Sequence, residues 1–129
     1  MLEFAFILPI LMTILVGIID LSVMLYDKAI ITNASREGAR YGVVVRGSSY
    51  ASNASVITYT QTYCANSLIT FTTTPTSAVI TSTPSVSPPS FGATLTVHVS
   101  YTYTDLILHN FVNHAPQWPL SATTVMAYE

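Results

Sequence analysis

Residues 2–41 have the sequence LEFAFILPILMTILVGIIDLSVMLYDKAIITNASREGARY, which sets the architecture of the whole chain. Residues 4–19 carry no charge, and after them apolar residues recur among charged ones at approximately helical spacing. No proline lies between Leu21 and Tyr41, so the pattern predicts one helix from about Leu2 to about Val45. At 1.5 Å per residue this helix is roughly 65 Å long, about twice the core of a bilayer. Its first half must project from the body of the protein and be covered by lipid or by neighbouring copies.

The apolar run at residues 4–19 is short for a membrane span, because a span needs about 20 residues. It reaches that length only if Glu3 and Asp20 lie at the two interfaces and residues 21–26 contribute. A secretory signal peptide fits poorly, since no basic segment precedes the run and no small-residue cleavage site closes it.

Two residues inside the run favour contact with another helix. Pro9 is expected to loosen or kink the helix, and Gly17 allows a second helix to approach closely. The alternative is that both reflect the ordinary tolerance of membrane helices for these residues.

The remaining residues predict a small head. Gly47–Ser49 interrupts the long helix, and residues 51–68 predict a second, shorter one. Residues 94–104 alternate strictly between apolar and polar side chains, which is typical of a half-buried strand. Further strands are predicted at 68–74, 78–83 and 120–128. The expected fold class is α+β and lollipop-shaped: a long N-terminal helix (domain 1–46) and a head of one helix and an antiparallel sheet of about four strands (domain 47–129).

Composition agrees with a protein held in a membrane or buried in an assembly. Of the 129 residues 50% are hydrophobic and 8% charged, the mean hydropathy is +0.52, and soluble domains average about 25% charged residues. The net charge of −2 predicts no nucleic-acid partner. Cys64 is the single cysteine, so it forms no disulfide within the chain and is expected to be a small, half-buried apolar side chain.

The sequence offers little for catalysis. His98, His109 and His114 lack the spacing and the accompanying acids or thiols of a metal site. No serine stands in a nucleophile-elbow context, carboxylates are few, and no glycine-rich phosphate-binding motif is present. We therefore expect no enzymatic activity, no metal and no cofactor.

Three segments carry a resemblance to a known family. The start LEFAFILP (residues 2–9) resembles the "VEFALVLP" opening of TadE-like proteins, and NASREGARY (residues 33–41) is similar to their "NAAREGARYA" segment. The final LSATTVMAYE (residues 120–129) resembles their closing strand. These are pilin-like subunits of the tight-adherence (Tad/Flp, type IV-related) pilus machinery of bacteria.

The resemblance implies a route and a set of partners. Such a subunit inserts in the inner membrane with its head outside, a prepilin-type peptidase removes a short basic leader, and an assembly platform moves the helix from lipid into a filament of identical copies. The end product is an extracellular pilus. In the family the acid stands five residues after the cut, whereas here it is residue 3. Either Met1 is the mature terminus with a shorter register, or this numbering lacks a few residues.

Glu3 is the residue with the sharpest expected role. A carboxylate at the start of an apolar helix is costly in a nonpolar environment, so we expect it to pair with the N-terminal amine of an adjacent subunit and to set axial register. The alternative is an acid at headgroup level without a partner. The full set of expected subunit-interface residues is Met1, Glu3, Phe4, Pro9, Gly17, Asp20, Asp27, Arg36, Glu37 and Arg40.

Charges beyond the apolar run allow two interpretations. Asp20 or Asp27 could pair with Arg36 or Arg40 of another copy, or these residues could form a solvated helix face with local pairs such as Glu37 with Arg40. The positive-inside rule would place this basic segment in the cytoplasm. A removed basic leader reverses that rule, and the Lys-free and Arg-free remainder of the chain favours an exterior head.

Two functions from different classes remain. The first is a structural pilin-like subunit, major or minor. The second is a membrane-anchored exterior binding module, with aromatic contacts from Tyr101, Tyr103, Phe111 and Trp118, or a pseudopilin that does not itself form the filament.

Overall fold

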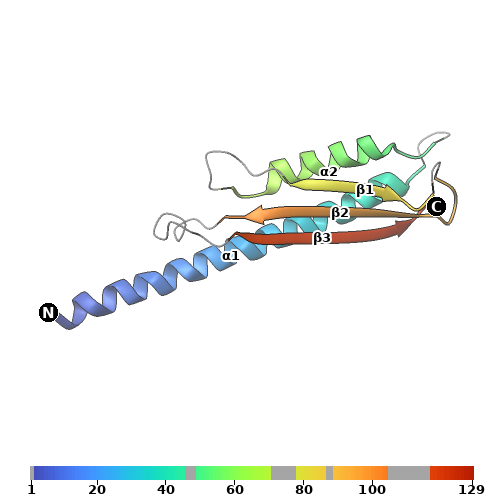
Figure 1. The fold of residues 1–129 in the computed structure, drawn as a ribbon. Helices are drawn as coiled ribbons and strands as arrows, with labels where there is room; N and C mark the ends of the chain where they lie inside the picture. The colour runs from blue at the N-terminus through green and yellow to red at the C-terminus, as the bar shows by residue number, and fades with distance from the viewer. Residues whose placement is uncertain (1, 46–48, 71–77, 87–88, 105–116) are drawn as a thin grey trace.

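The protein is described by a computed structural model that covers residues 2–45, 49–70, 78–86, 89–104 and 117–129. Within the first helix the side chains of Leu2, Glu3 and Ala5 are not described. The described chain has two helices and one sheet, with the N-terminus far from the rest of the molecule (Figure 1).

Helix α1, Leu2–Val43, is a single element of 42 residues, or about 63 Å. It continues through Pro9 and ends two residues before the predicted boundary, ahead of Gly47 and Ser48, which lie outside the described residues. Its first half projects as a bare rod and its second half lies against the sheet (Figure 1). We call residues 4–19 of α1 the stalk, and everything that packs around its second half the head.

Helix α2, Asn53–Ser67, has clear signals at both ends. The Ser52 hydroxyl accepts a hydrogen bond from the Ser55 backbone N–H (3.2 Å), which caps the first turn. At the other end the Leu68 N–H donates to the Cys64 carbonyl (2.9 Å). Buried Val56, Thr60 and Cys64 form the inner face of the helix, so α2 covers part of the core.

The sheet has three antiparallel strands in the order β1-β2-β3: Val79–Pro84, Thr94–Tyr103 and Trp118–Ala127. The α+β class and the lollipop shape are confirmed, but the described residues hold three strands where about four were predicted. The strand predicted at 68–74 is not found at Leu68–Thr70, and residues 71–77 lie outside the described part. The backbone donor of Leu68 closes α2, and that of Ile69 binds the Asp27 carboxylate (3.1 Å), so neither donates to a strand ladder.

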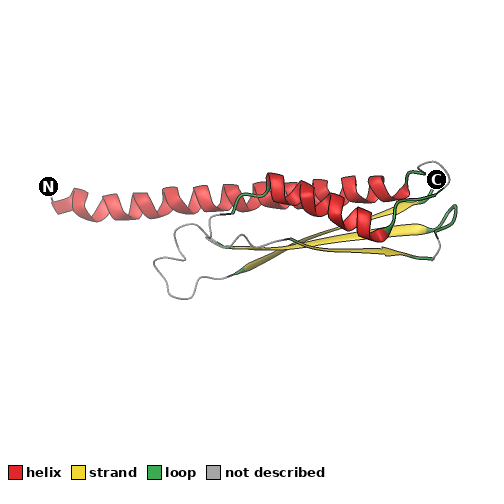
Figure 2. Ribbon diagram, turned by 90° about the horizontal axis from the view of Figure 1, so that it is seen from above, coloured by secondary structure: helices red, strands yellow, loops and turns green. Residues whose placement is uncertain are grey.

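The helices form one layer and the sheet the other (Figure 2). Helix α1 lies over β2 and β3, and α2 lies beside it over β1. The alternation predicted for β2 is confirmed, because its apolar residues all face the helices and are buried: Leu95, Val97, Val99, Tyr101 and Tyr103. The head core is therefore built on the second half of α1, and the stalk takes no part in it.

Candidate functional site: the stalk and its junction with the head

The stalk is apolar on every side. Apart from the half-buried Val16, its described large hydrophobic side chains from Phe4 to Ile19 are between 45% and 76% exposed. Each apolar Å² kept from water is worth about 25 cal/mol, so this rod needs a nonpolar partner. In the described part of the chain one helix is long and apolar enough to cross a membrane, with Phe6–Val43 as the candidate segment. The most apolar stretch of this segment is almost wholly exposed, so the helix is unlike the buried core helix of a soluble protein.

Polar groups within and next to the stalk are satisfied internally. The Thr13 hydroxyl donates to the Pro9 carbonyl (2.8 Å), and the Ser22 hydroxyl donates to the Ile18 carbonyl (2.7 Å). Such bonds to the preceding turn let hydroxyl side chains enter a nonpolar environment without an unpaired donor.

Three predicted interface residues lie bare on or in the stalk. Phe4 is 76% exposed, and Pro9 is exposed within the continuous helix. A Cβ added at Gly17 would meet nothing within 4 Å, so this glycine has no packing role inside the single chain. Met1 and the side chain of Glu3 lie outside the description, so the ion pair predicted for Glu3 stays a prediction.

The structure places both acids of the junction inside the head. Asp20 and Asp27 are two turns apart on one face of α1 and are 7% and 0% exposed. One Asp27 oxygen, Oδ1, accepts from the Ile69 N–H at 3.1 Å, and its Oδ2 has no hydrogen-bond partner among the described residues. Tyr103 donates its hydroxyl to the Asp20 carbonyl (3.3 Å). Because both side chains are buried, the head covers the acids and keeps them from whatever surrounds the helix.

The basic residues of α1 are, in contrast, all exposed. Arg36 and Arg40 are exposed and Glu37 is half-buried, and in the described part of the chain neither arginine forms an ion pair. Lys28 donates to the Ser121 carbonyl on the outer edge of β3. The structure therefore does not bring the acids of the junction together with Arg36 and Arg40 in one chain, and pairing between copies stays a prediction.

Two glycines that the sequence reasoning did not single out hold the head together. A Cβ on Gly38 would overlap the Thr60 hydroxyl, and one on Gly42 would overlap Leu95 and lie 2.9 Å from Val56 Cγ2. The available signal was their spacing of four, which puts both on one helix face. Part of the segment quoted for the family resemblance thus serves contacts within the chain.

Cys64, which was predicted to be half-buried, is fully buried, and Tyr101 also belongs to the core. Burial raises the pKa of the Cys64 thiol to about 11, so it stays protonated and unreactive at neutral pH. Burial, and to a smaller extent the Asp27 charge, raises the pKa of Tyr101 to about 12. His98 shares a hydrogen bond with Thr123 (2.8 Å) on the outer face of the sheet, and His109 and His114 lie outside the described residues.

A bare apolar rod continuous with a small α+β head is the architecture of a membrane-anchored, lollipop-shaped subunit. The model of the TadE-like protein family matches residues 1–40, so the chain is TadE-like over this segment, as the LEFAFILP and NASREGARY segments predicted. The match and the apolar helix together fit a pilus-related, membrane-anchored subunit. No curated protein and no solved structure matches the chain.

Proposed function

We propose that the chain is a pilin-like structural subunit, which the stalk first anchors in the inner membrane and later packs against copies of itself in an extracellular filament. One observation carries the proposal: almost all of the stalk is exposed, although the described part of the head has a buried core to which no stalk residue belongs. A second nonpolar environment is needed for the stalk alone. Lipid supplies it before assembly, and neighbouring stalks supply it afterwards.

The stalk suits both environments. Its hydroxyls are satisfied within the helix, which both lipid and a dry helix bundle require. The open flank of Gly17 offers a place where a neighbouring helix can approach closely. The same surface can therefore leave one environment for the other without rebuilding the head.

The head suits the outer surface of such a filament. From Gly47 onwards the chain has no Lys or Arg, and the outer face of β2 presents threonine, serine and His98. A prepilin-type peptidase and a pilus assembly platform are the partners that this route requires. The proposed role is structural, with no catalysis, cofactor or nucleic acid involved.

The rival binding module loses much of its expected contact surface. Tyr101 and Tyr103 are 4% and 2% exposed, so both belong to the core. Phe111 lies outside the described residues, and Trp118 alone among the four is exposed in the described chain.

The test separates membrane anchorage from filament assembly. Surface material sheared from cells is imaged by electron microscopy and analysed by mass spectrometry, for the unchanged chain, for Glu3→Gln and for the matched control Glu129→Gln on the exposed end of the head. We expect this chain in the filaments, loss of at least about tenfold of filament material in Glu3→Gln with the membrane fraction retained, and normal filaments in the control. Absence of the chain from every filament contradicts the proposal, and normal filaments from Glu3→Gln contradict the role of that carboxylate.

A further inference from the structure

Exposed aromatic and apolar side chains surround α1 at the level where it enters the head. We call them the collar: Leu21, Leu25, Tyr26, Ile69 and Trp118, each between 38% and 57% exposed. They come from α1, from the segment after α2 and from the start of β3.

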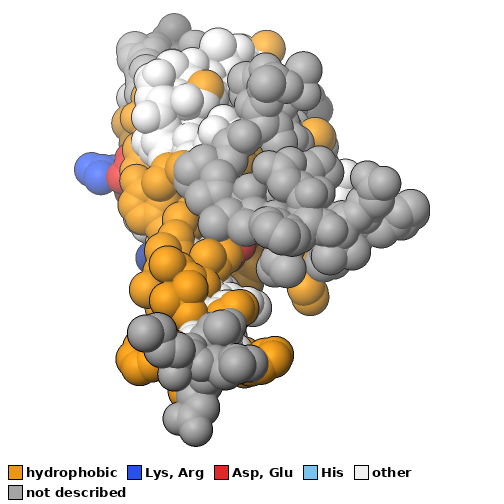
Figure 3. All heavy atoms as spheres, turned by 90° about the vertical axis from the view of Figure 1, so that its left-hand side faces the viewer, with side chains coloured by type: hydrophobic (Ala, Val, Ile, Leu, Met, Phe, Trp, Pro, Cys, Tyr) orange, Lys and Arg blue, Asp and Glu red, His pale blue; other side chains and the backbone are white. Residues whose placement is uncertain are grey.

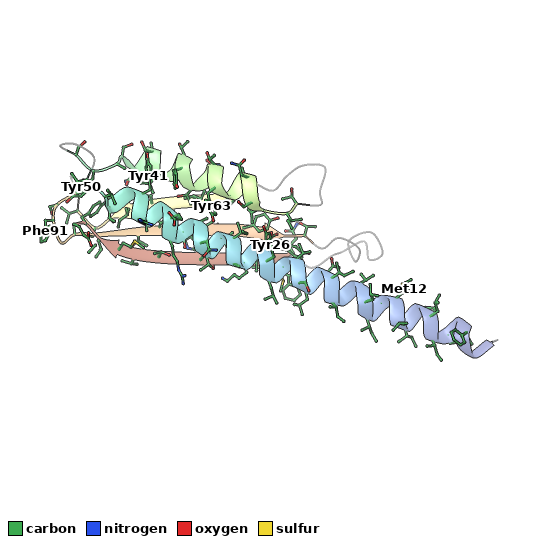
Figure 4. All side chains as sticks on the ribbon, turned by 180° about the vertical axis from the view of Figure 1, so that it is seen from behind. Met12, Tyr26, Tyr41, Tyr50, Tyr63 and Phe91 are labelled. Carbon is green, nitrogen blue, oxygen red and sulfur yellow. The ribbon has the colours of Figure 1, made fainter. Side chains whose placement is uncertain are left out.

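Contacts fix these residues at one height on the molecule. Ile69 is held at the height of Asp27, the residue that follows Tyr26 on α1, because its N–H donates to the Asp27 carboxylate. Trp118 lies opposite Tyr103 in the β2–β3 register, and Tyr103 reaches the Asp20 carbonyl through its hydroxyl. In Figure 4 Tyr26 lies where α1 leaves the head, and Figure 3, viewed along the stalk, shows hydrophobic side chains continuing from the stalk to the adjoining part of the head.

The charges at this height are arranged for contact with a nonpolar layer. Between Phe4 and Lys28 the sequence has two charged residues, Asp20 and Asp27, and the head covers both. The outward side of the same two turns of helix presents Leu21 and Leu25. Beyond the stalk, the first exposed charge on α1 is Lys28, just above the collar, and its ammonium donates to the Ser121 carbonyl.

The distance from the start of the stalk matches a bilayer. Phe4 and Tyr26 are 22 residues apart, which is about 33 Å along the helix, against a hydrocarbon core of about 30 Å. When α1 spans the core from Phe4 onwards, the level of Tyr26 therefore falls in the interfacial layer on the side of the head. Tryptophan and tyrosine prefer this layer because they combine an apolar ring with a polar group, and a lysine above it can reach phosphate groups.

We propose that the collar is a lipid-binding surface that seats the base of the head in the headgroup layer of the bilayer. This inference rests on the membrane anchorage proposed above and adds to it a fixed depth for the head. The stalk alone would let the chain slide along the membrane normal, whereas the collar and Lys28 stop it at one level.

The single tryptophan of the chain allows a direct test, because Trp118 is itself in the collar. The full chain is placed in vesicles of phosphatidylcholine and phosphatidylglycerol at low protein-to-lipid ratio, with spin-labelled lipids that quench fluorescence either near the headgroup or at the end of the acyl chain. We expect Trp118 emission to be blue-shifted, and quenching by the shallow label to exceed that by the deep label at least about twofold.

Two variants in a Trp118→Phe background calibrate the measurement. Met12→Trp places the probe in the middle of the stalk, and Phe91→Trp places it on an 85% exposed site at the far end of the head (Figure 4). We expect the deep label to quench the first preferentially and neither label to quench the second. Circular dichroism of all three proteins checks that they remain folded.

The outcomes are distinguishable. If Met12→Trp is not quenched by the deep label, the membrane anchorage itself fails. If Met12→Trp is quenched but Trp118 behaves like Phe91→Trp, the anchorage stands and the collar proposal is overturned. It is also overturned if Trp118 is blue-shifted without being quenched and the blue shift vanishes on dilution with lipid, because a second copy, and not lipid, would then cover the collar.

Discussion

The two halves of α1 are one helix with opposite surroundings. In the first half even Phe4 and Ile10 are more than 60% exposed, whereas in the second half Ile31, Ala34 and Ala39 are completely buried. The backbone is helical throughout, so local propensity does not separate the halves. What differs is residue size and charge. The stalk carries bulky apolar residues on all faces, and the second half carries small residues where it meets α2 and the sheet.

The largest expected contrast is between two leucines. Leu95→Ala in the core should lower the free energy of unfolding of the head by about 3 kcal/mol, because it removes a fully buried side chain and leaves a cavity. Leu11→Ala, at a stalk site that is 60% exposed, should leave it unchanged. Urea unfolding of the full chain in detergent, followed by near-ultraviolet circular dichroism, measures both. Equal losses would show that the stalk is part of the folding unit of the head.

A smaller contrast is expected between two glycines. Gly42→Ala should cost the head about 2 kcal/mol, since the new Cβ overlaps Leu95 and crowds Val56. Gly17→Ala should cost it nothing, because the flank of Gly17 is open in the single chain. The same urea titration serves. A Gly17→Ala chain that is stable but forms no filaments would locate the helix contact between copies, and a stable Gly42→Ala head would contradict the close approach of α1 to the core.

The smallest expected difference concerns alkaline pH. A thiol or phenol is neutral below its pKa, and burial raises the pKa of Cys64 from 9.0 to about 11 and that of Tyr101 from 10.0 to about 12. The unfolded chain therefore loses these protons first as pH rises. The contribution of the two neutral groups to the free energy of unfolding is complete below pH 9 and is lost progressively above it. Cys64→Ala should flatten the part of this decline between pH 9 and 11, relative to its own value at pH 8.

Residues 4–19 have no group that titrates in that range. Association of the chain with vesicles, measured by flotation at pH 8 and pH 10.5, should therefore stay constant while the stability of the head falls. A parallel loss of both would contradict the independence of the two regions.

Sequence patterns predicted the elements that depend on periodicity within one segment. The strict alternation of residues 94–104 predicted which side chains of β2 face the core. The predicted C-terminal end of α1 lies within two residues of the observed one. Both features repeat over many residues, so each position supports the others.

Features that depend on contacts between segments were not predictable in this way. The sequence did not decide whether Asp20 and Asp27 lie at a subunit interface or on a solvated helix face. The face that α1 turns to the rest of the head depends on residues far along the chain, such as Ile69 and Tyr103. The β-branched segment after α2 was predicted as a strand, but its first donors are taken by Cys64 and Asp27. Local propensity cannot register such distant partners.

The unbroken passage of α1 from stalk to head has a mechanical consequence. The described helix has no break between stalk and head, so the two are rigidly connected and rotate together about the helix axis. Each residue of an α-helix turns about 100° and rises 1.5 Å. A slip of one residue in how a stalk sits among its neighbours would therefore swing the head by about 100° around the axis while moving it by only 1.5 Å. In a filament whose subunits pack through their stalks, a slip in register would therefore change the orientation of the heads much more than their axial spacing.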